Sequence, residues 1–306
     1  MKCVFVYNAE SGKGQIKKYK DYILKKLAPK YGEIECIETT HAGHAHDIAK
    51  ESISKYDYFF VAGGDGTLNE VVNGMGNAEP DQKPIIGYIP TGTVNDVARS
   101  MGISRNIKKA VKNLLVGEPF EHDIFRVNRR YGIYVCCTGL FTKASYDTNR
   151  YNKKKYGKFA YFKNGIKELK NTTPLDIELK IGDEVIKKKC ALVLILNSKS
   201  VAGFKINKSA ELNDGEVEII LFHSDDEKID FCELKAMANA FLFGIKKTQN
   251  NPNVTHLKAS SFEITTKEGT VINLDGEKSK EGCFKFTVLQ KAIKIIAPKE
   301  KSATKI

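Results

Sequence analysis

The sequence predicts an α/β domain followed by a mainly antiparallel β-sandwich domain, with a cleft between the two. The chain has 306 residues, and since domains of about 100–200 residues are usual, two are expected. Hydrophobic residues make up 42% of the chain, enough for packed cores. Strands alternate with helices in the first third of the chain, whereas strands follow one another after about residue 120.

The first part of the chain has the strand–helix alternation of a parallel sheet flanked by helices. Tyr19, Ile23 and Leu27 recur at helical spacing and predict a helix over 14–29. Ligands of such folds bind beyond the carboxyl ends of the strands, so functional residues are expected there. Apolar runs predict the strands at 2–7, 34–38, 58–62 and 85–90.

The second part of the chain reads as an antiparallel β domain, because strand follows strand with only two helical stretches between them. The helical stretches lie near 154–170 and 228–247, and the polar tail from Pro298 is expected to be frayed. We place the domain boundary near residue 125. The predicted strands are 119–127, 132–138, 174–181, 185–197, 216–222, 262–266, 270–274, 283–289 and 292–297.

Charge and cysteine content limit the function classes. Lys and Arg number 49 against 37 Asp and Glu, a net charge of +12. The excess favours an anionic partner, although a lysine-rich surface in water would look the same. No zinc finger or arginine-rich tract points to nucleic acid. Seven cysteines without a C-x-x-C pair fit a reducing cytosol.

No stretch of the sequence has the roughly 20 consecutive apolar residues of a membrane span. The apolar run at the N-terminus, residues 1–7, is also too short for the apolar region of a signal peptide. Any membrane contact is therefore expected to be peripheral.

The segment with the strongest chemical signal runs from Val61 to Glu70 and contains Gly-Gly-Asp-Gly-Thr-Leu-Asn-Glu. A buried strand enters a glycine-rich turn that opens a helix, and such a helix N-terminus attracts phosphate. Asp65 would repel a phosphate unless a cation such as Mg²⁺ lay between them. The alternative is a tight turn in which Asp65 caps the helix.

A second strand-to-helix turn follows at Ile89–Asp96, which reads Ile-Pro-Thr-Gly-Thr-Val-Asn-Asp. It should lie on the same rim of the sheet as the first turn, so that the two form one phosphate cleft, although alone it could be a capped turn. The common phosphate motifs do not fit. The chain has no G-x-x-x-x-G-K-[ST], no complete dinucleotide fingerprint and no protein-kinase signature.

Two further segments are ambiguous when the residues are considered alone. Leu274-Asp275-Gly276-Glu277 could hold a carboxylate rigidly at a cleft, but a plain β-turn explains it as well. His41, His44 and His46 could suggest a metal site, yet their spacing is not a standard zinc pattern.

The two glycine motifs together resemble the catalytic domain of diacylglycerol kinases, most closely the small bacterial soluble lipid kinases. Sphingosine and ceramide kinases are more distant relatives. The resemblance runs from Val4 to about Pro298 and implies an α/β nucleotide-binding domain over 1–125 and a β-rich lipid-substrate domain over 126–289. It also implies that the segment 290–306, with a strand near 293–297, returns to the first domain.

The resemblance implies an ATP site made from four segments. The opening Asn8-Ala9-Glu10-Ser11-Gly12 matches the family's Asn-Pro-x-Ser-Gly, with Ala9 in place of proline. Thr40 matches a threonine that touches the nucleotide, and His44 then belongs to the loop structure. The implied ATP-binding residues are Asn8, Ala9, Glu10, Ser11, Gly12, Thr40, Gly63, Gly64, Asp65, Gly66, Thr67, Leu68, Asn69 and Thr93.

The resemblance also implies the catalytic residues. Glu277 matches the base that takes the proton from a lipid hydroxyl, and Asp275 would support it. Asp65, Asp96 and Asp123 match the acidic residues that organise the catalytic Mg²⁺ and its waters. The protein then has to position, neutralise and deprotonate its substrates.

A second Mg²⁺ site is implied at Glu211-Leu212-Asn213-Asp214-Gly215-Glu216. The ligands would be the Asp214 side chain and the backbone carbonyls of Glu211 and Glu216, while Asn213 replaces the family's first aspartate. The alternative is an ordinary hairpin turn.

Two segments could meet a membrane. The stretch 151–170 carries seven lysines and five aromatic residues, and 241–247 reads Phe-Leu-Phe-Gly-Ile-Lys-Lys. Basic residues suit anionic headgroups and aromatic residues suit the interface. The alternative is amphipathic helices whose aromatic residues pack on the β domain.

The hypothesis from the sequence is an ATP- and Mg²⁺-dependent lipid kinase that converts diacylglycerol to phosphatidate for phospholipid metabolism. We expect a cytoplasmic protein, peripherally associated with the inner face of the membrane, without a nucleic-acid partner and compatible with a homodimer. The alternatives are a kinase of phosphatidylglycerol or a long-chain base, a kinase of a soluble substrate such as the NAD kinases, and a non-catalytic nucleotide- or lipid-binding module.

Overall fold

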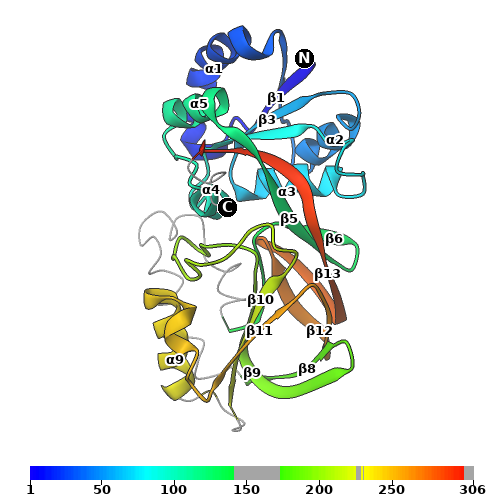
Figure 1. The fold of residues 1–306 in the computed structure, drawn as a ribbon, viewed down its shortest axis with the longest axis vertical. Helices are drawn as coiled ribbons and strands as arrows, with labels where there is room; N and C mark the ends of the chain where they lie inside the picture. The colour runs from blue at the N-terminus through cyan, green and yellow to red at the C-terminus, as the bar shows by residue number, and fades with distance from the viewer. Residues whose placement is uncertain (141–172, 225–228, 230, 300–306) are drawn as a thin grey trace.

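The computed structural model describes residues 1–140, 173–224, 229 and 231–299 (Figure 1). The first domain is a parallel sheet in the order β2-β1-β3-β4, with one strand from the end of the chain beside β4. The predicted strands of this domain are confirmed. They are β1 (Cys3–Tyr7), β2 (Ile34–Glu38), β3 (Tyr58–Gly63) and β4 (Ile85–Pro90).

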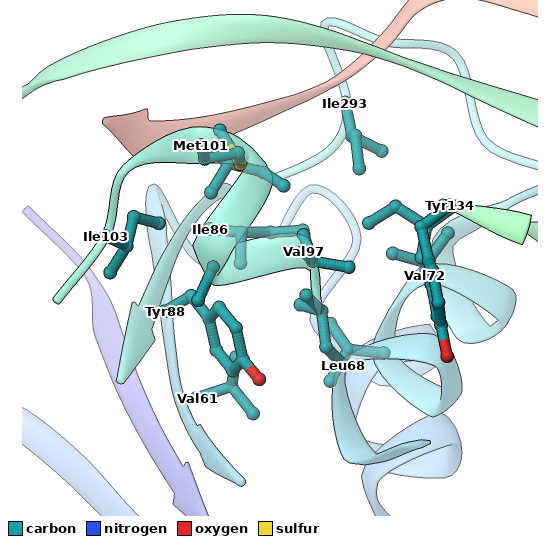
Figure 2. Packing of buried hydrophobic residues seen from close by; sticks show 14 of the residues in the cluster. Val61, Leu68, Val72, Ile86, Tyr88, Val97, Met101, Ile103, Tyr134 and Ile293 are labelled. Carbon is teal, nitrogen blue, oxygen red and sulfur yellow. The ribbon is translucent and has the colours of Figure 1, made fainter. Parts of the chain in front are cut away.

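Helices surround this sheet because each has an apolar stripe to bury. In α1, Ile16, Ile23, Leu27 and Tyr31 recur at helical spacing and are fully or almost fully buried. Figure 2 shows part of the core, where Tyr88 and Ile86 from β4 lie beside Val97 from α4. The helices are η1 (Ser11–Gly14), α1 (Gln15–Tyr31), α2 (His44–Glu51), α3 (Asp65–Met75), α4 (Asp96–Met101) and α5 (Ile107–Val116).

The second domain consists of antiparallel strand pairs, as predicted. Its backbone order is β11-β10-β9-β7-β12-β13, with β8 against β9 and β12 and with β6 on β5. The strands are β5 (Glu118–Val127), β6 (Arg130–Gly132), β7 (Val135–Gly139), β8 (Leu175–Ile181), β9 (Glu184–Leu196), β10 (Val217–Ser224), β11 (Val254–Ala259), β12 (Ser261–Leu274) and β13 (Glu277–Ala297).

Several predicted elements differ from the structure. The helical stretch 228–247 is α9 (Phe231–Phe243) followed by η3 (Ile245–Thr248), and β11 was not predicted. The predicted helix at 154–170 lies outside the described residues. Within the described part of the chain, no helix has both the length and the apolar character needed to cross a bilayer.

Strand β13 joins the two domains and can be followed from the lower into the upper one in Figure 1. Two strands were predicted here, but the chain stays extended through an irregularity between Leu289 and Ile293. At that point Lys291 has φ 54°, and its N–H donates to Oδ1 of Asp123 at 2.6 Å. The end of β13 then pairs with β4 in parallel through Ile295 and Ile86, so β13 joins the strands of the two domains into one continuous sheet.

The described residues form two hydrophobic cores. One lies mainly around the parallel sheet and also takes in Tyr134 and Leu194 from the second domain. The other fills the β-sandwich and includes Phe125, Phe262 and Phe284. The predicted fold class is confirmed, while the position of the domain boundary stays a prediction.

Candidate active site

The two glycine turns lie against each other at the carboxyl ends of β3 and β4. The Thr91 N–H donates to the Gly63 carbonyl at 2.8 Å. A Cβ added at Gly92 would lie 2.5 Å from the Cα of Gly64, so no larger residue fits without moving backbone. The two turns therefore form a single rim, as the sequence predicted.

Asn95 holds the second turn in shape. Its Oδ1 accepts the Gly92 N–H at 2.9 Å, and its Nδ2 donates to the Gly92 carbonyl at 2.8 Å. Asn95 itself has φ 56°, a left-handed conformation that asparagine tolerates better than most residues. The buried Tyr88 hydroxyl lies within hydrogen-bonding distance of the Gly63 carbonyl and of Oδ1 of Asn95. Asn95 belongs to the motif noted in the sequence but was given no role there, and Tyr88 was not singled out.

Asp65 begins α3 but binds the start of another helix. Its carboxylate accepts the N–H groups of Asp96 at 3.1 Å and Val97 at 3.2 Å, at the N-terminus of α4. Burial, and then the charge of Asp96, raise the pKa of Asp65 to about 7. The alternative in which Asp65 caps its own helix is wrong, because Asp65 links the two glycine-turn helices.

Asp96 connects the rim to the second domain. Its buried Oδ1 accepts the Ser200 hydroxyl at 2.6 Å and the Gly203 N–H at 2.9 Å. Burial raises the pKa of Asp96 above its ordinary value. Sequence reasoning missed Ser200 and Gly203, since no local pattern marks the segment that contains them.

The pair Asp65 and Asp96 fits a divalent cation. Each carboxyl has a raised pKa, and the negative charge of Asp96 contributes to the shift at Asp65. A cation would stabilise both ionised forms. Among the described residues, no group of three or more His, Cys, Asp or Glu side chains gathers to hold a metal. Phosphate oxygens and water would have to complete the coordination shell, as is usual for Mg²⁺.

The N-terminal segment lies beside the same rim. The Asn8 N–H donates to the Ala62 carbonyl, which connects the end of β1 to β3. Asn8 Oδ1 accepts the Glu10 N–H at 3.0 Å, and the Thr91 hydroxyl donates to Ser11 Oγ at 3.0 Å. The predicted ATP residues of the opening segment thus lie next to the second glycine turn.

Thr40 and the histidines form a compact loop. The Thr40 hydroxyl lies 2.9 Å from Nδ1 of His41 and 3.1 Å from Nδ1 of His44, and the two rings stack at 4.8 Å. The Thr40 N–H also donates to His44 Nδ1. These contacts are those of a structured loop. Thr93 is exposed, and its carbonyl accepts a bond from Arg105.

Asp275 is the most fully bonded carboxylate of the site. It is buried, Oδ2 accepts from Asn69 Nδ2 and the Ile133 N–H, and Oδ1 accepts from the N–H groups of Tyr134 and Val135. Burial raises the pKa of Asp275 to about 6. All four donors are protein groups, so Asp275 holds the β12–β13 turn against α3 rather than facing a ligand.

Glu277 and Asn69 are placed by this contact. Asp275 at φ 52° and Gly276 at φ 96° form the turn, and Glu277 opens β13 with an exposed side chain. Asn69 is buried, and its amide also donates to the Tyr131 carbonyl at 3.2 Å. The predicted ATP contact of Asn69 stays a prediction, as does the base role of Glu277.

Asp123 lies in a second acidic cluster. Its Oδ2 accepts the Gly215 N–H at 2.7 Å, and its Oδ1 accepts the Lys291 N–H, so it joins the 211–216 turn to the irregular part of β13. Burial raises the pKa of Asp123, and its charged neighbours are Asp214 and Lys291. The charged neighbours of Asp65, in contrast, are Asp96 and Asp275. The Mg²⁺ role predicted for Asp123 stays a prediction.

The carboxylate of the predicted second Mg²⁺ site already has a cation. Lys258 Nζ lies 2.9 Å from Asp214 Oδ2 and 3.9 Å from Glu218, and the contact with Asp214 raises the pKa of Lys258. Glu211 is exposed and Glu216 is half-buried. An ion bound by the Asp214 side chain would therefore compete with the Lys258 ammonium group, and the second Mg²⁺ site stays a prediction.

A parallel sheet that ends in two glycine turns with paired carboxylates is suited to binding phosphate groups. The family model "Diacylglycerol kinase catalytic domain" matches residues 2–127, and "YegS C-terminal NAD kinase beta sandwich-like domain" matches residues 135–297. The diacylglycerol kinase of Bacillus subtilis is 33% identical over 300 residues, which are 97% of this chain and 96% of the relative.

Further comparisons agree. The diacylglycerol kinase of Staphylococcus carnosus is 33% identical over 98% of this chain and 96% of its own length. A crystal structure of a candidate diacylglycerol kinase from Bacillus anthracis superposes with a TM-score of 0.83 at 25% identity, covering 98% of this chain and 96% of that one. The chain therefore belongs to the diacylglycerol kinase family, and it is a kinase.

Proposed function

We propose that this kinase transfers the γ-phosphate of ATP to the hydroxyl of a lipid alcohol, diacylglycerol being the first candidate. The observation that carries the proposal is the joining of three parts. Asp65 binds the two glycine-turn helices together, Asp96 connects the rim to the second domain, and Asp275 holds the Glu277 turn against α3. The two glycine turns, the second domain and the Glu277 turn are thus joined by hydrogen bonds, which supports a shared site.

Each part has a distinct task. The glycine turns bind the phosphates through backbone N–H groups. Asp65 and Asp96 would hold Mg²⁺, which when bound neutralises charge on the transferring phosphoryl group. Glu277 would take the proton from the lipid hydroxyl as the oxygen attacks phosphorus. Asp275 positions Glu277 and does not itself need to exchange a proton.

The test varies the lipid acceptor. Labelled γ-phosphate from ATP·Mg²⁺ is offered to diacylglycerol, phosphatidylglycerol and a long-chain base in mixed micelles. We expect a labelled product on diacylglycerol that is absent with Asp65→Ala. We expect Glu277→Gln to bind ATP and to lose turnover, whereas retained turnover would remove Glu277 from the base role.

A kinase of a soluble substrate is the second candidate, because the family model that matches residues 135–297 is described by its likeness to NAD kinases. Equal activity with and without lipid would favour it. ATP binding without turnover on any acceptor would favour a binding module. For the lipid kinase we further propose a cytoplasmic location and peripheral contact with the inner face of the membrane, in keeping with the net charge of +12.

A further inference from the structure

Two adjacent apolar side chains are exposed at the end of α9. Leu242 is 53% exposed and Phe243 is 63% exposed. Among the described residues, the other exposed large hydrophobic side chains are Met1, Val116 and Val185, which lie far from one another in the sequence. Burying a Leu and a Phe in an apolar phase is strongly favourable, so this pair is suited to contact with something apolar.

Exposed lysines lie on the segments next to the pair. Lys246 and Lys247 follow it in the chain and are exposed. Lys205 is exposed on a neighbouring segment, whose position is fixed because the Ile245 N–H donates to the Ile206 carbonyl at 2.8 Å. The segments 201–210 and 241–250 contain four lysines and no Asp or Glu. We call Leu242, Phe243, Lys205, Lys246 and Lys247 the α9 patch.

The helix that carries the patch is packed against the rest of the protein. Ala236, Met237 and Ala240 bury the inner side of α9, so the helix already has its protein partner. The Phe241 ring packs edge-on against Phe204 with centroids 5.8 Å apart. The exposed pair is therefore an outward face of a packed helix and not a frayed end.

A short segment of the chain connects the helix that carries the patch to Asp96. Phe204 directly follows Gly203, whose N–H binds Asp96, and Ser200 binds the same oxygen. One short segment, 200–206, thus touches Asp96 at one end and α9 at the other. The segment 200–206 therefore connects the helix that carries the patch to Asp96.

We infer that the α9 patch docks this kinase on an anionic lipid bilayer. Leu242 and Phe243 enter the apolar layer, and Lys205, Lys246 and Lys247 meet the acidic headgroups. The choice of a membrane rests on charge complementarity together with the exposed apolar pair. The inference rests on the proposed function in one respect: it names the surface that makes the peripheral membrane contact proposed there. Vesicle binding can be measured whether or not a lipid is phosphorylated.

The test measures binding of the full chain to vesicles by sedimentation, without nucleotide. Vesicles of phosphatidylcholine alone are compared with vesicles that also contain phosphatidylglycerol. We expect Lys246→Gln/Lys247→Gln to weaken binding to the anionic vesicles roughly 25-fold, since each lysine near such a surface contributes about a factor of five. Leu242→Ser/Phe243→Ser should weaken it at least as much.

Matched controls separate the patch from general charge and hydrophobicity. Lys25→Gln/Lys26→Gln removes two adjacent exposed lysines from α1, at the opposite end of the molecule in Figure 1. Val185→Ser removes an exposed apolar side chain from β9. Both controls should bind like the parent chain. Equal losses in patch and control variants, or unchanged binding of the patch variants, would overturn the inference.

Two other outcomes are informative. A concentration-dependent dimer in analytical ultracentrifugation that Leu242→Ser/Phe243→Ser abolishes, with vesicle binding unchanged, would make a second copy the occupant and overturn the membrane. If the patch variants lose vesicle binding while no lipid is phosphorylated by the parent chain, the docking surface stands and the proposed reaction fails. If short-chain diacylglycerol in solution is still phosphorylated by these variants, the loss is confined to docking, as we expect.

Discussion

Replacement of Asp275 by Asn tests whether this carboxylate is a structural clamp. The two side chains have nearly the same shape, so only the hydrogen-bonding pattern changes. Asp275 accepts bonds from four protein donors, two on each oxygen. The asparagine amide group would present N–H to donors, and two buried donors would lose their acceptor.

The magnitude follows from those two donors. Each buried donor without an acceptor costs about 1–3 kcal/mol, so Asp275→Asn should lower the free energy of unfolding by about 2–6 kcal/mol. For a chain of this size the melting temperature should fall by roughly 4–12 °C. Since the pKa of Asp275 is about 6, the measurement belongs at pH 8, where the parent carboxyl is ionised.

The assay is thermal unfolding followed by circular dichroism, with Glu277→Gln as the matched control. Glu277 lies two residues further on and is exposed, so its replacement should leave the melting temperature within about 1 °C. An Asp275→Asn variant that melts with the parent chain would refute the clamp. Its activity loss should then be traced to chemistry instead.

Three more perturbations test the remaining contacts. Gly92→Ala should lower the free energy of unfolding, measured by denaturant titration, and the affinity for nucleotide, because its Cβ would meet the Gly64 backbone. Gly66→Ala is the control: its Cβ meets nothing within 4 Å, so this variant should unfold like the parent chain. Lys258→Met should destabilise the protein by up to about 1 kcal/mol, since Asp214 loses a half-exposed cation that water already screens. Mg²⁺ should raise the melting temperature of this variant more than that of the parent. The pKa of Asp65 is about 7, so below that pH a divalent cation must displace a proton from its carboxyl group. The affinity for Mg²⁺·nucleotide, measured by calorimetry, should therefore fall up to roughly tenfold per pH unit. An affinity that does not change with pH, or the same pH profile in Asp65→Asn, would contradict this.

Much of the fold was predictable because it is encoded in local periodicity. The strands β1 to β4 are short apolar runs separated by helical patterns, and parallel strands of this kind leave their carboxyl ends on one rim. The meeting of the two glycine turns followed from that rule. The missed strand β11 has a mixed pattern of burial, which gives little period-2 signal.

The site was predictable in its residue types and only partly in its contacts. The glycines and carboxylates can be recognised from the sequence, because their residue types and spacing are those expected of a phosphate site. Their partners do not: Ser200 is 104 residues from Asp96, and Asn69 is 206 residues from Asp275. A hydrogen bond between such distant residues depends on the packing of two domains, which no local pattern describes.

The sequence by itself determined the two domains, most of their strand patterns and the identity of the residues in the two glycine turns, since hydrophobic period and turn chemistry are local properties. Only the tertiary structure decided what each carboxylate does. Asp65 accepts hydrogen bonds from the N-terminus of α4, and Asp275 accepts them from four protein donors. Asp123 accepts them from the 211–216 turn and from β13. The physical reason is burial: a carboxylate removed from water must take its partners from whichever backbone the fold brings beside it.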